Sequence, residues 1–386
     1  MDATAAIENV PPVSPPIQQT PVAGGHGETA AALNRAEALV HAHRYQEAIE
    51  ALGNVTVPAV SAPDLALRVL FCDSWSRMYL GNLESAVATL ERARALTERS
   101  SFSDVDRAEA MFRLGCCRVK LGKVANANSL FSVALGLADT GTPDGDRLRA
   151  RIFDWRSRSY QLQREWEAAQ SDAERSLELA ESLGDDRLAA NALMQCSLVA
   201  ERRGDPLLAR FYAERSRTLA IETGDRQTEA RLLNNLGGLS FLLGEPEIAV
   251  AYFKESFAVA LEVGNDADAA QAVSSLAQVH LRCGAPLLAE EQGRHALSIL
   301  SDRGDYLDER GNTHLVIGRA LLQQERTDEA MTEFAAAEWL FEQIGSKSHV
   351  AAAWLAQGDA YQALGDREAS STLFRRAAEA LQDFNF

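Results

Sequence analysis

The chain has 386 residues, more than one hydrophobic core usually organises, so its length favours either several globular domains or one extended array of repeats. Its formal net charge of −17 disfavours direct binding to the phosphate backbone of nucleic acids. No run approaches about eighteen consecutive apolar residues, and no basic region followed by an apolar stretch opens the chain, so we expect a protein without a membrane span or secretion signal.

Residues 1–27 differ in composition from the rest of the chain. Five prolines are followed by a glycine-rich stretch, and such a segment can neither hold a helix nor bury enough apolar surface to fold. We therefore predict a disordered leader. A shorter break, over residues 55–63, separates the first predicted helix pair from the second.

From residue 28 onward, a small residue recurs twelve positions before an alanine, or once a serine. The spacing between repeats is 38 to 42 residues, and the nine pairs are Ala36/Ala48, Ser74/Ala86, Gly115/Ala127, Ser157/Ala169, Ser197/Ala209, Gly237/Ala249, Ala277/Ala289, Gly318/Ala330 and Gly358/Ser370. Two helices can approach closely where both carry small side chains, and the bulky residue four positions after the alanine, such as Phe131 or Phe253, would fill the space beside them. Each repeat is predicted to be one such helix pair.

Turn residues divide the repeats at two regular places. Glycine tolerates the left-handed conformation that ends a helix, and a following Asp or Asn can cap the next helix. One set of turns follows the early small residue by seven positions, at Gly81, Gly122, Gly204, Gly244 and Gly365, and a second set joins repeats at Gly184-Asp185, Gly224-Asp225 and Gly264-Asn265. The predicted repeats are residues 28–60, 64–103, 104–145, 146–184, 185–224, 225–264, 265–304, 305–345 and 346–386.

The combination of Leu236-Gly237, Ala249, Phe253 and Ser256 resembles the tetratricopeptide repeat in its longer, forty-residue form. The resemblance covers about residues 28 to 386. It implies an all-α fold, a right-handed α-solenoid of about nine antiparallel helix pairs, and a function in binding rather than catalysis.

Segments 153–176, 269–279 and 374–383 are also similar to the repeat half of actinobacterial helix-turn-helix regulators. Those relatives carry an N-terminal DNA-binding domain, whereas this sequence has the proline-rich leader there. We expect a repeat protein that does not itself bind DNA.

The resemblance assigns groove-facing roles to positions two, five, six and nine of each first helix, counting the early small residue as position eight. These positions are rich in amides, which donate and accept hydrogen bonds at once, and in arginines, which bind carboxylates. Two tryptophans are possible anchors. The groove candidates are Arg68, Trp75, Arg113, Arg151, Trp155, Arg158, Asn191, Gln195, Arg231, Asn234, Asn235, Gln278, Asn312 and Arg319. An alternative is that some of these charges only pair along their own helix.

No pattern of catalytic or metal-binding residues is present in the sequence. The seven histidines are scattered, H-E-x-x-H is absent, and the repeat accounts for the glycines. We expect no catalytic residue, metal or cofactor, and therefore not an enzyme. The five cysteines show no C-x-x-C spacing, which favours a reducing cytoplasm, and we interpret all five as small packing residues, together with inter-helix packing for Trp166, Trp339 and Trp354.

These observations predict a cytoplasmic bacterial regulatory adaptor whose groove binds a protein or peptide. Its arginines favour an acidic partner or a free carboxylate. The alternative is the ligand-sensing half of a transcriptional regulator that acts with a separate DNA-binding protein. No extra polar helix covers the apolar face of the last repeat before Asp383-Phe384-Asn385-Phe386. Either this aromatic tail folds back over that face, or two chains meet there as a homodimer, which is the alternative we favour.

Overall fold

A computed structural model describes residues 26–42, 44–53, 55, 62–80, 82–99, 101–300, 306–344 and 346–381. These described residues form 18 α-helices and no β-strand. The first ten helices are α1 (His26–His41), α2 (Tyr45–Leu52), α3 (Pro63–Tyr79), α4 (Leu83–Thr97), α5 (Asp104–Lys120), α6 (Val124–Ala138), α7 (Pro143–Leu162), α8 (Trp166–Leu183), α9 (Asp186–Arg202) and α10 (Pro206–Glu222). The others are α11 (Arg226–Leu242), α12 (Pro246–Glu262), α13 (Asp266–Arg282), α14 (Pro286–Ile299), α15 (Leu307–Gln323), α16 (Thr327–Gln343), α17 (Lys347–Ala363) and α18 (Arg367–Leu381).

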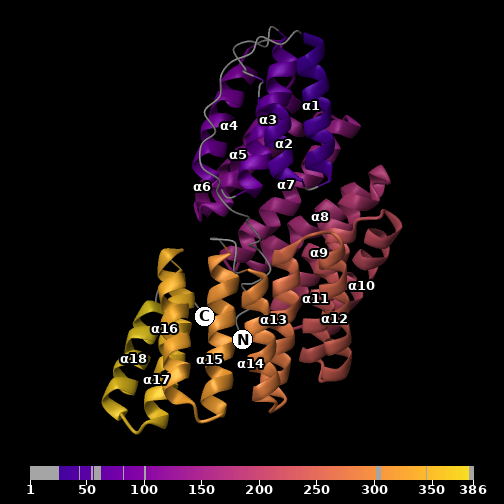
Figure 1. The fold of residues 1–386 in the computed structure, drawn as a ribbon. Coiled ribbons are helices and arrows are strands. Elements are labelled where there is room, and N and C mark those ends of the chain that lie inside the picture. Colours follow the sequence, from indigo (N-terminus) through magenta and orange to yellow (C-terminus); the bar gives the residue numbers. More distant parts are fainter. Residues whose placement is uncertain are drawn as a thin grey trace. The chain divides into compact units, whose positions relative to one another are not determined.

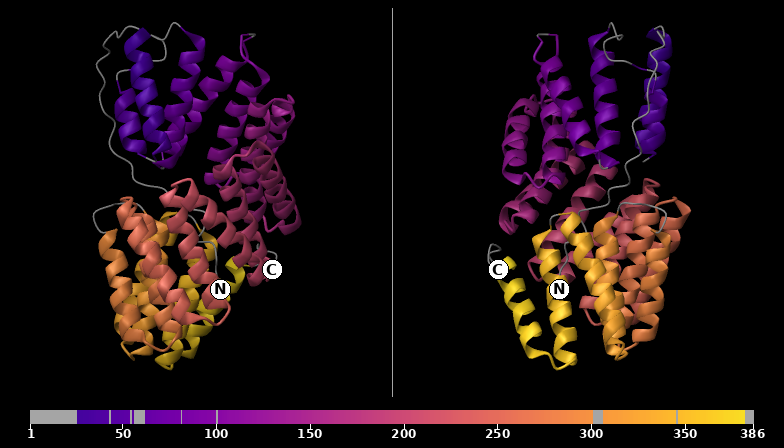
Figure 2. Two further views of the ribbon diagram at one scale, coloured as in Figure 1. Left: turned by 90° about the vertical axis from the view of Figure 1, so that its right-hand side faces the viewer. Right: turned by 60° about the vertical axis from the view of Figure 1, so that its left-hand side comes forward.

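The helices pack as nine adjacent pairs, which confirms the predicted all-α solenoid of paired helices (Figure 1). We call the odd-numbered member of each pair the first helix and the even-numbered member the second helix. The chain divides into two compact units inside α10, between Leu219 and Ala220. Within each unit every first helix after the opening one (α1 or α11) packs against the second helix of the preceding pair (Figure 2). The assignment of all repeats to one domain stays a prediction.

The predicted turn residues have the backbone and capping geometry that their chemistry suggests. Gly184, Gly224 and Gly264 take positive φ angles of 62°, 67° and 70°, which a residue without a Cβ adopts at little cost. The residue that follows each glycine accepts a hydrogen bond from a backbone N–H of the next helix. Asp225 Oδ1, for instance, lies 3.1 Å from the amide nitrogen of Thr228. The junctions between repeats therefore stop one helix and start the next.

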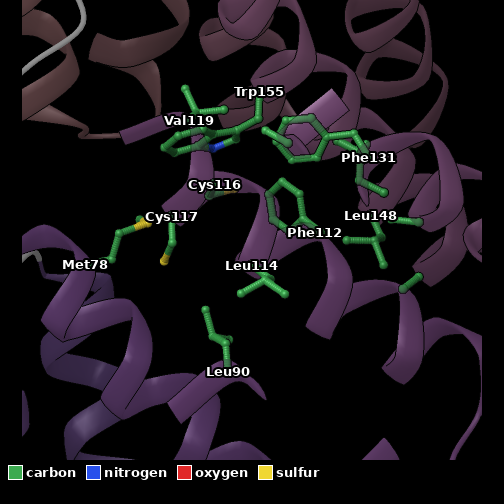
Figure 3. Close-up of a cluster of buried hydrophobic side chains, with 14 of the residues drawn as sticks. Met78, Leu90, Phe112, Leu114, Cys116, Cys117, Val119, Phe131, Leu148 and Trp155 are labelled. Carbon is green, nitrogen blue, oxygen red and sulfur yellow. The ribbon is translucent and has the colours of Figure 1, made fainter. Parts of the chain in front are cut away.

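Four of the nine pairs are closed by a phenylalanine that lies directly against the small glycine of the first helix. A Cβ atom added to Gly237 would lie 2.6 Å from the Phe253 ring, and one added to Gly115 would lie 2.5 Å from the Phe131 ring. Figure 3 shows Phe131 beside Phe112 in the buried cluster of the N-terminal unit. The recurring glycine and phenylalanine are thus one contact, made from the two helices of a pair.

Serines make the same close approach with a hydrogen bond in place of a ring. Ser157 Oγ donates to the Ala169 carbonyl at 2.7 Å, and Ser216 Oγ donates to the Ala190 carbonyl at 2.7 Å. Ser256 repeats the second contact on Ala230, 2.8 Å away. Because all three hydroxyls are buried, each needs this partner, and the hydrogen bond fixes how one helix slides along the other.

Two expectations about packing residues are wrong. Four cysteines are buried, as expected, but Cys283 is exposed because it lies at the end of α13 rather than on its packed face. Trp339 is 58% exposed on α16, whereas Trp354 packs between helices, with its indole nitrogen 2.5 Å from Glu338 Oε1 and the Arg376 guanidinium over its ring. Residues that lie off the packed side of their helix, such as Trp339, are exposed to solvent.

Several predicted features lie outside the described residues: most of the leader 1–27, most of the break 55–63, the Gly81 turn and the end 383–386. α1 begins at His26, two residues before the predicted start of the first repeat. Among the helices that the structure describes, none is long and apolar enough to cross a membrane.

We predict that Gly237→Ala lowers the free energy of unfolding by about 1–3 kcal/mol, because its methyl group must displace the Phe253 ring from a packed core. Urea denaturation followed by circular dichroism measures this. Gly136→Ala on α6, where an added Cβ meets nothing within 4 Å, is the control and should not destabilise the protein. An unfolding midpoint of Gly237→Ala at or above that of the wild type would contradict the packing assignment.

Candidate functional site

In the N-terminal unit, the predicted groove residues of α3 are held by neighbouring helices. Arg68 donates from both Nε and Nη2 to the carboxylate of Glu37 on α1, at 3.0 and 2.5 Å, and also to Asn34. Both members of the ion pair are partly solvated, with 48% and 32% of their side chains exposed. Arg68 therefore joins α3 to α1.

A buried carboxylate joins the next two first helices. Glu109 on α5 accepts from Arg113 Nε at 2.5 Å and from Arg151 Nη1 and Nη2 on α7 at 3.0 and 3.2 Å. Burial opposes ionisation of Glu109, but the two guanidinium groups outweigh it and hold the pKa of this carboxyl below its usual value. Both predicted arginines are thereby occupied by one internal partner.

The two predicted tryptophan anchors pack on this cluster and on each other. The Arg113 guanidinium carbon lies 4.7 Å from the centre of the Trp75 ring, and Trp75 meets Trp155 edge-on at 6.3 Å between ring centres. Trp155 is only 9% exposed and belongs to the buried cluster drawn in Figure 3. Its role is in the core, because the aromatic rings of α3 and α5 cover the face that the sequence pattern assigned to ligand.

Further along this unit, α7 and α9 share a second polar cluster. Arg158 Nη2 lies 3.1 Å from Asp154 Oδ2, whereas Asp154 Oδ1 is buried with no hydrogen-bond partner in the described structure. Burial raises the pKa of Asp154, and Arg158 opposes that rise. Gln195 is buried against Gln161, 3.1 Å away, and Asn191 is half-buried at the start of α9. This cluster too is mostly engaged within the fold.

In the C-terminal unit, α11 carries three of the predicted groove residues, and all three are partly exposed. Arg231 Nε donates to Asp268 Oδ2 on α13 at 3.1 Å, and its side chain remains 36% exposed. Asn234 accepts a hydrogen bond of 3.1 Å from Ser275 Oγ on α13, which leaves its NH2 group to donate elsewhere. Asn235 is half-buried, and the described structure gives its amide no hydrogen bond.

The neighbouring first helices continue this polar face. Gln278 on α13 and Arg319 on α15 are exposed, and Asn312 on α15 donates to Asp308 Oδ1 at 3.2 Å. The packing of α13 against both α11 and α15 brings these side chains to one side of the unit. We call the set Asn234, Asn235, Gly238, Ser275, Gln278 and Arg319 the amide surface.

The two units thus use similar residue types differently. In the N-terminal unit, guanidinium groups are saturated by carboxylates and aromatic rings; in the C-terminal unit, amide groups with spare donors and acceptors face outward. Sequence analysis missed Ser275, Gly238, the buried carboxylate of Asp268 and the contact of Glu109 with Arg151. The carboxylates sit near the start of their helices, facing the adjacent first helix, which the repeat spacing alone does not reveal.

Across the described part of the chain, no three side chains of His, Cys, Asp or Glu come together in a way that could hold a metal ion.

Family models described as tetratricopeptide repeat match residues 74–142, 228–302 and 351–380. No curated protein matches the sequence. Solved structures with a similar fold include a Rap protein complexed with Competence and Sporulation Factor, at 16% identity and a TM-score of 0.65, covering 92% of this chain and 98% of that one. They also include the apo quorum sensor NprR from B. thuringiensis (12%, 0.63, 92% and 98%) and the Rap conjugation gene regulator of plasmid pLS20 in complex with the Phr* peptide (14%, 0.57, 93% and 98%).

We predict that Glu109→Gln lowers the free energy of unfolding by about 2–4 kcal/mol, because it leaves two partly buried guanidinium groups without their counter-charge. The depressed pKa of Glu109 makes this contribution present above its unfolded pKa of about 4.3 and lost as the pH falls further. Urea denaturation at pH 7 and pH 3 should therefore show a smaller difference from the wild type at pH 3 than at pH 7.

The matched control is Glu37→Gln, which removes the same charge from the more solvated pair with Arg68 and should change stability by no more than about 1 kcal/mol. Equal effects of the two substitutions at pH 7 would show that Glu109 is not the internal partner on which the cluster depends.

Proposed function

Because this chain is a tetratricopeptide repeat protein, we propose that it is a non-enzymatic regulatory scaffold that binds an extended peptide or protein segment on the amide surface of its C-terminal unit. The observation that carries the proposal is the pair Asn234 and Asn235 on α11. One amide is oriented by Ser275 and the other has no hydrogen bond within the described fold, so both retain capacity for a ligand.

An asparagine side chain matches the polar groups of a peptide bond. Its NH2 group donates to a carbonyl and its oxygen accepts from an N–H, so two adjacent asparagines can hold a main chain without selecting its side chains. Ser275 strengthens the match because it fixes the orientation of Asn234 before any ligand arrives, which reduces the entropy lost on binding.

Two solved structures of similar fold support a peptide as the occupant. One is a Rap protein complexed with Competence and Sporulation Factor, and the other, described as a conjugation gene regulator, is in complex with the Phr* peptide. We propose a comparable regulatory role for this chain, in the cytoplasm of a bacterium, where its five unpaired cysteines would remain reduced.

The chemical preference of the ligand is a finer part of the proposal. Arg231 and Arg319 can attract an acidic residue or a free carboxylate. Asp268, however, already accepts a hydrogen bond from Arg231, and Arg319 already interacts with Asp359, where it opposes the rise in the pKa of Asp359 that burial causes. We propose that any preference for acidic ligands is modest and comes from these two arginines. A separate DNA-binding partner and a homodimer at the C-terminal end stay predictions.

A library of random linear dodecapeptides panned on the immobilised protein tests the proposal. We predict that selected peptides bind the wild type and that Asn234→Ala combined with Asn235→Ala weakens their affinity about 10- to 100-fold, the loss expected for two or three hydrogen bonds. Fluorescence anisotropy with a labelled peptide measures the dissociation constants, and circular dichroism confirms that the variant folds.

Asn126→Ala is the matched control, because Asn126 is an exposed asparagine on the second helix α6 and lies outside the amide surface. Unchanged affinity of the double variant, or an equal loss with Asn126→Ala, would refute the assignment of the amide surface.

A further inference from the structure

Gly238 on α11 has no role in the packing of the protein. Its neighbour Gly237 faces Phe253, and glycines 115, 318 and 358 likewise face a phenylalanine at distances that no Cβ atom could share. A Cβ atom built on Gly238, in contrast, meets nothing within 4 Å. Its backbone is helical, so it does not need the positive φ that only glycine adopts readily.

A glycine in this place is unfavourable for the fold. Inside a helix, glycine loses more conformational freedom on folding than alanine does, and Gly238 lies well inside the seventeen residues of α11. A glycine leaves the backbone of a helix open to close approach by another main chain, which a longer side chain would block. The described part of this protein places no atom of another helix against Gly238, so that space is open to a ligand.

The position of Gly238 connects it to the amide surface. It follows Asn234 by four residues and Asn235 by three, so the three residues share one face of α11. The positions equivalent to Gly238 on α13 and α15 hold the long, exposed side chains of Gln278 and Arg319. Among these three helices, α11 therefore presents bare backbone where its neighbours present polar side chains.

We propose that Gly238 is the contact position at which the main chain of an extended peptide lies against α11, with Asn234 and Asn235 bonding the peptide group that rests there. This rests on the proposed function and adds to it a steric requirement for ligand backbone at α11. A carboxylate side chain would supply only acceptors and an ammonium group only donors, whereas an extended peptide supplies both.

The test compares Gly238→Ala with Gly136→Ala, using a labelled dodecapeptide selected on the wild type. Both glycines are in helices and face open space, so both substitutions should raise Tm by about 1–4 °C. Gly238→Ala should weaken peptide binding at least about tenfold and Gly238→Leu still more, because each displaces the peptide backbone, while Gly136→Ala should leave the affinity unchanged.

Each outcome discriminates. Wild-type affinity of Gly238→Ala, together with weakened binding by the double Asn234 and Asn235 variant, would overturn this inference alone. Wild-type affinity of all these variants, or no peptide recovered from the library, would overturn the proposed function as well. If Gly238→Leu lowers Tm, the affinity of Gly238→Ala decides between the outcomes, because its methyl group meets no atom of the protein. A fall in the Tm of Gly238→Ala would itself overturn the claim that this glycine has no packing role.

Discussion

The close contact between the two helices of each pair is the constraint on which the rest of the structure depends. Where a glycine faces a phenylalanine ring, as Gly237 faces Phe253, or a serine donates to a carbonyl of the partner helix, as Ser216 donates to Ala190, the first helix has one rotation and one translation relative to the second. That fixes which side of every first helix faces outward. The amide surface exists because Asn234 and Asn235 fall on that side of α11.

The charges on the outward side of the first helices differ between the two units, and so does what that side binds. In the N-terminal unit, Glu109 draws Arg113 and Arg151 together, and Trp75 stacks on the charged cluster, so the side chains bind each other. These contacts link consecutive first helices, which makes them part of the architecture. In the C-terminal unit, neutral amides replace most of the charges. Leaving an amide without a hydrogen-bond partner costs less free energy than leaving a buried charge unpaired, so an amide can remain unpaired until a ligand binds.

Much of this could be predicted from the sequence because the repeat is a packing rule. The spacing of Gly237, Ala249 and Phe253 gives the helix pair, and Gly224-Asp225 gives its boundary, since both depend on contacts within one repeat. Which of the predicted groove positions stay open to solvent could not be predicted, and two of them, Trp155 and Gln195, are buried. The partner of Arg151 is Glu109, forty-two residues earlier, and no local pattern shows which charges across two repeats will meet. The prediction that Trp339 packs between helices was wrong for a similar reason, because its exposure depends on which side of α16 is left uncovered.

The most direct measurement of the central claim is a nuclear magnetic resonance titration of the deuterated, 15N-labelled protein with a selected peptide. The account predicts that the side-chain NH2 resonances of Asn234 and Asn235 and the backbone amide of Gly238 shift together, with small changes at Trp75 and Trp155, whose indole groups are packed inside the N-terminal unit. Shifts concentrated at those two indole N–H signals, with Asn234, Asn235 and Gly238 unchanged, would contradict it.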